Sequence, residues 1–317
     1  MNVQIVDGET VHRLLDYPGL VEALRLAHRD EAPPETKALL TGEPGGAAKF
    51  LSLLAWAPRD LIAVKLVGEF PQNTKREPPL ASVQGIVALF SGETGAPVFA
   101  CDGAALTFRK TAADSALGVD LLARRDAEVL LVVGAGGLAP HVIAAHTSQR
   151  PSLRRVLVWN RDPAKAAGLV RRLDLPGLTI AAVTDIDAAV SQADIISCVT
   201  MSRQPLVRGA LLRPGTHVDL IGSYLPEMRE SDDEVMRRGR IFVDTRNECT
   251  RSGDLGQPLA NGTITMAKIE ADLYELCSAR REGRSNDDEI TVYKNSGGAH
   301  LDLYTARHLM RVLEEGR

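Results

Sequence analysis

The spacing of apolar residues along the chain changes near residue 128. From there on, short runs rich in β-branched residues alternate with stretches in which apolar residues recur at helical spacing. The expected strands are 129–133, 156–159, 178–183, 194–200, 217–221 and 240–243, and the expected helices are 141–149, 163–173 and 233–238. Alternation of this kind predicts βαβ units built around a parallel sheet.

The first part of the chain follows another pattern. Residues 61–67 (LIAVKLV) and 82–90 (SVQGIVALF) read as strands, and the turn 91–97 (SGETGAP) leads into a return strand at 98–101. Strands joined by turns of this composition favour a largely antiparallel sheet. Apolar residues at helical spacing over 111–122 predict a helix that connects this part to the next.

The end of the chain predicts a return to the first part. A strand-like segment, ITVYKNSG (290–297), precedes an amphipathic helix over 299–315. This helix has no obvious place in a six-stranded α/β unit, so we expect it to pack on the N-terminal portion. The prediction is an α/β protein with a doubly wound parallel sheet over 119–295 and a discontinuous α+β domain made of 1–118 and 296–317.

A glycine motif directly follows the first strand of the second part. Gly134, Gly136 and Ala139 stand between the apolar run EVLLVV and a helical stretch, in the pattern GxGxxA. The first glycine permits a tight turn, the second lets the backbone approach a pyrophosphate, and the alanine lets helix and strand pack closely. The helix N-terminus adds free N–H groups and a positive dipole end. With Gly137 and Leu138 in the same turn, the motif predicts a Rossmann-type dinucleotide site; the alternative is a turn that binds nothing.

The end of the second strand indicates which dinucleotide is bound. An NAD-specific site usually has Asp or Glu at this tip, where it binds the ribose hydroxyls. This chain has Asn160 and Arg161 there. Asparagine does not repel a 2′-phosphate, and arginine can pair with one. NADPH is therefore favoured over NADH, unless Arg161 is only a solvated loop charge.

Three cations stand out in the first part. Lys65 interrupts the apolar strand LIAVKLV, and an unpaired lysine is costly to bury. It lies either on an edge strand facing water or in a pocket that holds an anion. Arg109 and Lys110 lie in a stretch, LTFRKTAADSALG, that leads into the expected helix, and at least one of them could bind a carboxylate.

Composition narrows the class of protein. Of the 317 residues, 44% are hydrophobic and 25% are charged, which suffices for a folded core. A net charge of −4 without a basic face argues against nucleic acid as a partner. No apolar run reaches the ~18 residues that a membrane span needs. The four cysteines, at 101, 198, 249 and 277, show no metal-binding spacing and fit a reducing, cytoplasmic compartment.

The chain resembles the ornithine cyclodeaminase/mu-crystallin family over nearly its whole length. The matching stretches are VKLVGEFPQN (64–73), SGETGAPVFACDGAALTFRKTAADSAL (91–117), VVGAGGLAPH (132–141), VWNRDPAKA (158–166), VDLIGSYLPEMRESDDEVM (218–236) and ITVYKNSGGAHLDL (290–303). The resemblance implies a homodimer in which the discontinuous domain binds substrate and mediates dimerisation. It also implies a cofactor bound between that domain and the Rossmann domain.

The resemblance implies roles for single residues. Lys65 matches the lysine that binds the substrate carboxylate. Lys110 stands where the family usually has Arg, so it stays open whether Lys110 or Arg109 contacts the substrate or the cofactor. A lysine in that place offers a point charge instead of a planar fork. No secure match exists for the family's early substrate-binding arginine.

The resemblance also implies further contacts with cofactor and substrate. Ser82 and Thr111 match residues that contact the cofactor, and Thr200 and Ile221 fall beside the nicotinamide ribose and ring. Asn295 and Ser296 lie in the late segment that approaches nicotinamide and substrate in the family.

Tyr224 marks a departure from the cyclodeaminases of the family. They have G-A/G-D after the fifth strand, with an Asp as acid/base, whereas this chain has Gly222-Ser223-Tyr224. A tyrosine ordinarily titrates near ~10 and is a poor base at neutral pH. We expect Tyr224 to line the substrate pocket. The following PEMRESDDEVM resembles the PxxRExDD segment of the ketimine reductases.

Three functions are weighed on these grounds. The favoured one is NADPH-dependent reduction of Δ1-pyrroline-2-carboxylate or Δ1-piperideine-2-carboxylate to L-proline or L-pipecolate. No dedicated base is then needed if the iminium forms in solution or takes its proton from Lys65 or water. The alternatives are an ornithine cyclodeaminase, against which Tyr224 and Asn160 argue, and a non-catalytic NADPH-dependent binder of a small ligand.

Overall fold

The computed structural model describes residues 3–316 and divides them into two compact units. Unit 1 contains the chain up to Lys110 together with Gly298 onward, and unit 2 is Thr111–Gly297. The sequence-based boundaries, 118/119 and 295/296, lie close to these. The first of them falls inside helix α3 (Gly103–Leu122), which runs through the boundary in the chain.

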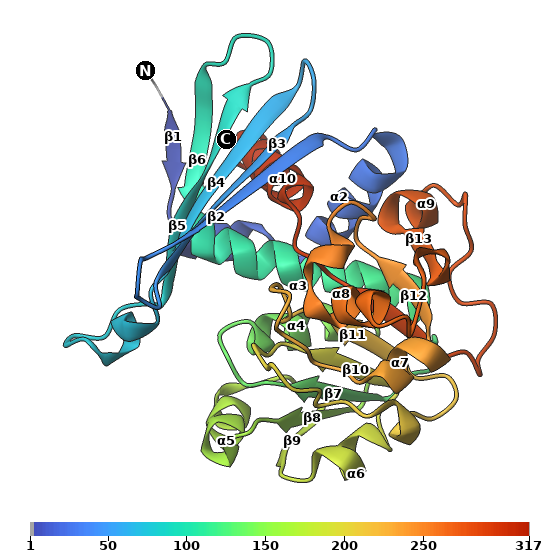
Figure 1. The fold of residues 1–317 in the computed structure, drawn as a ribbon. Coiled ribbons are helices and arrows are strands. Elements are labelled where there is room, and N and C mark those ends of the chain that lie inside the picture. Colours follow the sequence, from blue (N-terminus) through green and yellow to red (C-terminus); the bar gives the residue numbers. More distant parts are fainter. Residues whose placement is uncertain (1–2, 317) are drawn as a thin grey trace. The chain divides into compact units, whose positions relative to one another are not determined.

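Unit 1 contains a six-stranded sheet (Figure 1). Its strands, in spatial order, are β1 (Gln4–Val6), β6 (Pro97–Asp102), β5 (Val83–Ser91), β4 (Leu61–Glu69), β3 (Lys49–Trp56) and β2 (Glu35–Gly42). Every neighbouring pair is antiparallel except β1 and β6, so the predicted antiparallel character is confirmed. Because β4 lies between β5 and β3, it is an interior strand.

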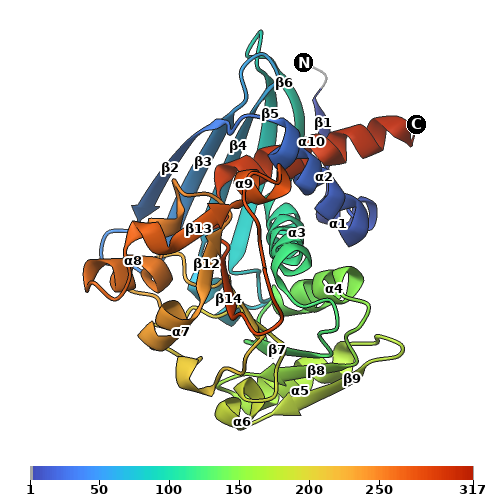
Figure 2. The same cartoon turned by 90° about the vertical axis from the view of Figure 1, so that its right-hand side faces the viewer.

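Three helices cover one side of this sheet (Figure 2): the first and the last contact its strands, and the second packs on the last. They are α1 (Gly8–Leu14), α2 (Tyr17–Asp30) and α10 (Ala299–Glu315). Asp7 and Asp16 cap the first two by accepting backbone N–H groups of the first turn. The last helix has the predicted bounds and contacts β4 and α2, as its amphipathic pattern led us to expect.

The opposite face of the sheet exposes apolar side chains. The strand register places exposed large residues of all six strands on this same face, two of them from β3, because paired residues share a face and successive residues alternate between faces. These residues are Ile5, Leu39, Phe50, Trp56, Leu66, Ile86 and Val98. We call this set the outer apolar face. A face of this kind is typical of an interaction surface.

Unit 2 contains an eight-stranded sheet in which all neighbours are parallel. Its spatial order is β13 (Ile269–Asp272), β12 (Arg240–Val243), β14 (Thr291–Lys294), β11 (His217–Leu220), β10 (Ile195–Cys198), β7 (Val129–Val133), β8 (Arg155–Trp159) and β9 (Thr179–Val183). Strand β10 is shorter than the expected strand 194–200, because the chain leaves the sheet after Cys198.

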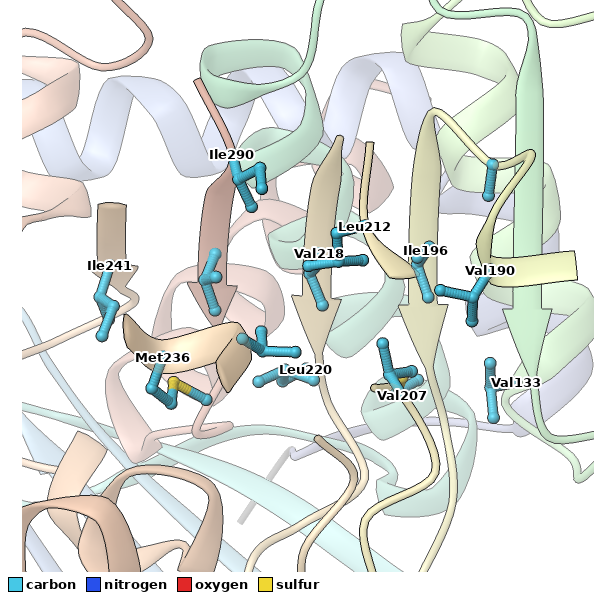
Figure 3. Packing of buried hydrophobic residues seen from close by; sticks show 14 of the residues in the cluster. Val133, Val190, Ile196, Val207, Leu212, Val218, Leu220, Met236, Ile241 and Ile290 are labelled. Carbon is cyan, nitrogen blue, oxygen red and sulfur yellow. The ribbon is translucent and has the colours of Figure 1, made fainter. Parts of the chain in front are cut away.

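Helices cover both faces of this sheet. On one face, α4 (Ala139–Gln149) and α5 (Pro163–Arg172) pack on Leu130 and Val132. On the other, α6 (Ile186–Val190), α7 (Asp233–Arg238) and α8 (Gly253–Ala260) share the core that contains Leu131 and Val133; α9 (Leu273–Cys277) follows β13. Figure 3 shows the second core, with Val218, Leu220 and Ile196 facing Val207 and Met236. The doubly wound Rossmann-type fold is confirmed.

Two differences from the predicted elements have local causes. Helix α3 begins at Gly103, earlier than the expected Thr111, because the Asp102 carboxylate accepts the Ala105 N–H at 2.7 Å and caps it there. Helix α4 begins at Ala139, earlier than the expected His141, since Pro140 fits a first turn. Within residues 3–316, no helix is both long and apolar enough to span a membrane.

Candidate active site and cofactor pocket

The glycine turn of unit 2 has the geometry that the sequence predicts. Gly134 adopts φ +119°, and a Cβ there would lie 2.9 Å from the Val199 carbonyl oxygen, so a larger residue would be strained and crowded. Gly136 and Gly137 are exposed, and a Cβ on Gly136 would meet open space. The backbone at Gly136 is therefore accessible to a ligand.

A cavity of about 970 Å³ opens at this turn. It is lined by Gly134–Gly137, by Trp159–Asp162 at the end of β8 and by Val199–Gln204 after β10. Helix α4 begins directly beyond the turn, with Leu138 at its N-cap and no side chain capping it. Its first N–H groups can therefore bind an anion.

The end of β8 contributes both polar groups and cations to the cavity. Asn160 Oδ1 accepts the Ala135 N–H at 3.2 Å, so this side chain also holds the glycine turn. Arg161, Lys165 and Arg172 line the same cavity and are exposed. None of these three side chains has a hydrogen-bond or ion-pair partner among residues 3–316. Together they offer positive charge where an additional phosphate would bind.

Glu230 joins the ends of the two central strands β10 and β11. Its Oε1 accepts the Thr200 N–H at 2.6 Å and the Thr200 hydroxyl at 2.8 Å. Its Oε2 accepts the N–H groups of Gly222 at 2.7 Å and Ser223 at 3.3 Å. This fully buried carboxylate therefore fixes the backbone next to two predicted cofactor contacts, Thr200 and Ile221.

The surroundings of Glu230 are also charged and buried. The Asp254 carboxylate accepts the Glu230 N–H at 2.8 Å, and Lys294 Nζ lies 3.6 Å from Asp254 Oδ2. Lys294 also donates to the Ser223 carbonyl at 2.7 Å. Burial raises the pKa of Glu230 to about 7; Asp254 adds to this rise and Lys294 opposes it. The cluster holds two carboxylates and one ammonium group.

Asn295 is held in place by α3 after the end of β14. Its Nδ2 donates to the Thr111 carbonyl and to the Ser115 hydroxyl, both at 3.0 Å. Ser115 in turn donates to buried Asp219 at 2.9 Å. Two predicted cofactor contacts, Thr111 and Asn295, are thus brought together within unit 2.

Ser296 has an unsatisfied hydroxyl. Its backbone N–H and that of Gly297 donate to Asp244 Oδ2 at 2.8 and 3.0 Å. Burial raises the pKa of Asp244, and the backbone N–H groups of Thr245 and Ser296 oppose this rise. The Ser296 Oγ is buried and has no partner among the described residues. A buried polar atom of this kind is ready to bind a ligand.

Lys65 lies in the interior strand β4 and is 4% exposed, so the alternative of an edge lysine facing water is wrong. Its register neighbours, Leu53 and Val87, are buried on the face that α10 covers. Lys65 Nζ donates to Asp302 Oδ1 at 3.0 Å. Burial lowers the pKa of Lys65 to about 8, an effect that Asp302 opposes and Lys110 increases.

Lys110 joins this ion pair within unit 1. Its Nζ lies 3.4 Å from the same oxygen, Asp302 Oδ1, and 3.4 Å from the Gly298 carbonyl, to which it donates. Both Lys110 and Asp302 are 1% exposed. The cluster therefore holds two ammonium groups and one carboxylate, with one positive charge in excess.

Arg109 lies apart from this cluster. Its Nε donates to His12 Nδ1 at 3.1 Å, its Nη2 donates to the His12 carbonyl at 2.7 Å, and its guanidinium stacks over the Tyr17 ring. The structure thus brings Lys110, and not Arg109, together with Lys65.

Two further predicted residues lie in or beside loops. Ser82 precedes β5 in unit 1, and its carbonyl accepts the Phe70 N–H at 2.7 Å. Tyr224 lies in the loop after β11 in unit 2 and is 36% exposed. Neither observation shows what the side chain binds, so the roles of both residues stay predictions.

Sequence reasoning missed two acidic residues. Asp302 lies on the apolar side of the final helix, in the stretch AHLDLYTARHL, and a charge on that side signals a buried partner. Glu230 was noted only as part of the PxxRExDD pattern. Its acceptor role could not be read from spacing, because its partners belong to other strands.

The chain is similar to known proteins over most of its length. Residues 51–316 match the model of the ornithine cyclodeaminase/mu-crystallin family. A Δ1-pyrroline-2-carboxylate reductase of Paracoccus denitrificans is 42% identical over 309 residues, covering 96% of this chain and 95% of that protein.

Two solved structures extend the comparison. The Δ1-pyrroline-2-carboxylate reductase of Thermococcus litoralis, in complex with NADH and L-proline, superposes with a TM-score of 0.92 at 27% identity, covering 99% of this chain and 98% of that one. A probable ornithine cyclodeaminase from Bordetella pertussis Tohama I gives 0.86 at 29% identity, covering 100% and 98%. With the family match spanning most of its length, the chain belongs to the ornithine cyclodeaminase/mu-crystallin family.

Proposed function

We propose that this protein reduces a cyclic imino acid, Δ1-pyrroline-2-carboxylate or Δ1-piperideine-2-carboxylate, to L-proline or L-pipecolate with NADPH. The observation that carries the proposal is the buried cluster of Lys65, Lys110 and Asp302, whose excess positive charge suits a monocarboxylate. It occurs in a chain whose relatives in Paracoccus and Thermococcus are reductases of the first of these substrates. The protein is an NAD(P)H-dependent oxidoreductase acting on a C=N bond.

The residues present fit a dinucleotide. Gly134–Gly137 and the N-terminus of α4 would hold the pyrophosphate, since this turn offers exposed backbone and uncapped N–H groups. Thr200, Ile221, Asn295 and Ser296 are the proposed contacts of the nicotinamide half. When bound, the reduced nicotinamide supplies a hydride, and the chain supplies binding and orientation.

The choice of NADPH rests on the end of β8. Arg161, Lys165 and Arg172 line the cavity, and no carboxylate stands at position 160. Cations at this place suit a 2′-phosphate. The Thermococcus relative was solved with NADH, so the cofactor preference is a property to be measured for this chain itself.

On the substrate side, Lys65 and Lys110 are proposed to hold the carboxylate. Fixing a small substrate in one orientation contributes to catalysis, because two reactants then behave as one assembly. Arg109 is not assigned this role, since its guanidinium is bound to His12. Tyr224 is proposed as a wall of the substrate pocket.

The decisive experiment measures NADPH oxidation with five- and six-membered cyclic imino acids, with NADH as the second cofactor. Turnover with at least one of these substrates is expected. L-ornithine without added reductant is the control for cyclodeaminase activity, and ammonia release from it would favour that alternative. Cofactor and substrate binding with no steady-state turnover would instead identify a binding protein.

The proposal includes a homodimer formed through the outer apolar face. Leu66 lies at the centre of that face and is 37% exposed. Leu66→Glu should convert the dimer to a monomer, measured by light scattering after size-exclusion chromatography. Leu26→Glu, at an equally exposed leucine of α2, is the matched control and should leave the mass unchanged. A monomeric wild-type protein would contradict the proposal.

A further inference from the structure

Asp302 has one oxygen more than its partners use. Its Oδ1 accepts from Lys65 at 3.0 Å and lies 3.4 Å from the Lys110 ammonium group. Its Oδ2 is buried and has no hydrogen-bond partner among the described residues. A buried carboxylate oxygen without a donor is costly, and a catalytic role or a bound group is among the explanations for such an atom in a native structure.

The charges around this oxygen indicate what kind of ligand completes it. The charged groups that face Lys65 within unit 1 are Asp302 on α10 and Lys110 on α3. Cys101 on β6 is also close enough for Asp302 to raise the pKa of its thiol, after burial and Asp102. The cluster thus offers cations for an anion and, beside them, a carboxylate oxygen for a cationic N–H.

A protonated cyclic imino acid has both of these groups. Its carboxylate is attached to the carbon of the C=N⁺–H group. The carboxylate and the N–H donor are therefore bonded to the same carbon atom. Lys65 and Lys110 match the first group, and Asp302 Oδ2 matches the second. An unprotonated imine has no N–H to give, so this arrangement favours the protonated form.

Building on the proposed function, we propose that Asp302 is a catalytic residue whose Oδ2 accepts the iminium N–H and keeps the substrate protonated. In the reaction a hydride adds to the imine carbon and the C=N π electrons move onto nitrogen. The proton already on nitrogen stays there, so the product is a neutral secondary amine. The substrate is reduced by two electrons and the nicotinamide is oxidised by two. No protein group gives up a proton in this step.

The test compares two ligands of the enzyme–NADP⁺ complex by calorimetry. L-proline has a carboxylate and N–H donors, whereas cyclopentanecarboxylate has the same ring size and carboxylate without nitrogen. In Asp302→Asn, L-proline should bind about 10-fold or more weakly, the worth of a charge-assisted hydrogen bond. Cyclopentanecarboxylate should bind at least as tightly as before, because both lysines remain.

Kinetics provide the second measurement. Asp302→Asn should lower kcat/KM for the cyclic imine by about 100-fold or more, as for loss of a preorganised electrostatic contact in an active site, with an unchanged Kd for NADPH. If Asp302 only positions the lysines, both ligands will weaken in proportion, and that outcome overturns the inference. Equal binding of L-proline by wild type and variant also overturns it.

A second variant covers a failure to fold. Lys110→Met with Asp302→Asn removes one ammonium group together with the carboxylate and so keeps the charge of the cluster. The same loss of preference for L-proline over cyclopentanecarboxylate is expected in it. A wild-type protein that turns over no cyclic imine would remove the proposed function, whereas normal turnover with an unchanged ligand preference in both variants removes only the role of Asp302.

Discussion

The two units each bury a cluster of three charges, and the clusters are opposite in sign. Unit 1 has Lys65 and Lys110 on one carboxylate, and unit 2 has two carboxylates, Glu230 and Asp254, near Lys294. All the side chains concerned are nearly or fully buried. Burial favours the neutral form of one group of the majority charge in each cluster. It lowers the pKa of Lys65 to about 8 and raises the pKa of Glu230 to about 7.

The clusters differ in how the excess charge is compensated. Glu230 accepts three backbone N–H groups and one hydroxyl, so the protein itself stabilises the carboxylate. In unit 1, by contrast, Lys65 and Lys110 share a single carboxylate oxygen, Asp302 Oδ1, and Lys110 also donates to the Gly298 carbonyl. A buried charge that protein donors stabilise, such as that of Glu230, suits a structural role. A buried cluster with a net charge, such as that of Lys65, Lys110 and Asp302, suits the binding of a charged ligand.

Removing Lys65 should have the largest effect. Truncating one partner of a buried charge pair in a binding site costs about 2–5 kcal/mol, so loss of one of the two proposed carboxylate-binding cations in Lys65→Ala should lower kcat/KM for the imine by about 10²- to 10³-fold. The Kd for NADPH, measured by nucleotide fluorescence, should stay the same. Lys37→Ala, at a lysine whose side chain is 75% exposed, is the control. Full activity of Lys65→Ala would remove Lys65 from the mechanism.

The pH dependence of kcat/KM should report the ionisation of the Lys65 ammonium group. Because burial lowers the pKa of Lys65 to about 8, the ammonium form is lost as pH rises through that value. We expect kcat/KM to fall about 10-fold per pH unit above it. Lys65→Arg keeps position 65 charged at every pH in this range and should move the decline to higher pH. An unchanged profile in that variant would assign the decline to the substrate.

The preference for NADPH over NADH should change when a cation in the cavity of unit 2 is removed. Arg161→Ala removes a cation of the cavity and should lower the ratio of kcat/KM for NADPH to that for NADH by about 10- to 100-fold, the range of a charge-assisted hydrogen bond. Arg171→Ala, at an exposed arginine of α5 that does not line the cavity, is the matched control. A clear preference of the wild type for NADH would contradict the assignment of Arg161.

Local signals in the sequence were sufficient for the nucleotide turn and for α10. Gly134 follows a continuous apolar strand, and the amphipathic period of 299–315 gives a helix of those bounds. Strand β2 was missed because its exposure on both faces leaves no alternation to detect. The pairing of Lys65 with Asp302 was missed for another reason. The two residues are 237 positions apart, and only the packing of α10 on β4 brings them together.

The smallest expected effect concerns Glu230 and the stability of unit 2. Glu230→Gln leaves one acceptor oxygen and places an NH₂ group against backbone donors, which should cost about 1–3 kcal/mol of unfolding free energy at about pH 5. The pH dependence has a definite sign. The folded-state pKa of Glu230 is raised, to about 7, so its protonated form favours the folded state. That contribution is lost as pH rises through the folded pKa.

The free-energy difference between wild type and Glu230→Gln should therefore shrink from about pH 5 to about pH 8, as denaturant titration would show. Glu234→Gln, at a carboxylate of α7 that is 41% exposed, should give no such change. A difference that grows with pH would mean that the ionised carboxylate is favoured by its four donors over burial. In that case the cluster of unit 2 would tolerate its excess charge better than Lys65 tolerates its own, and the contrast between the two clusters would be sharper still.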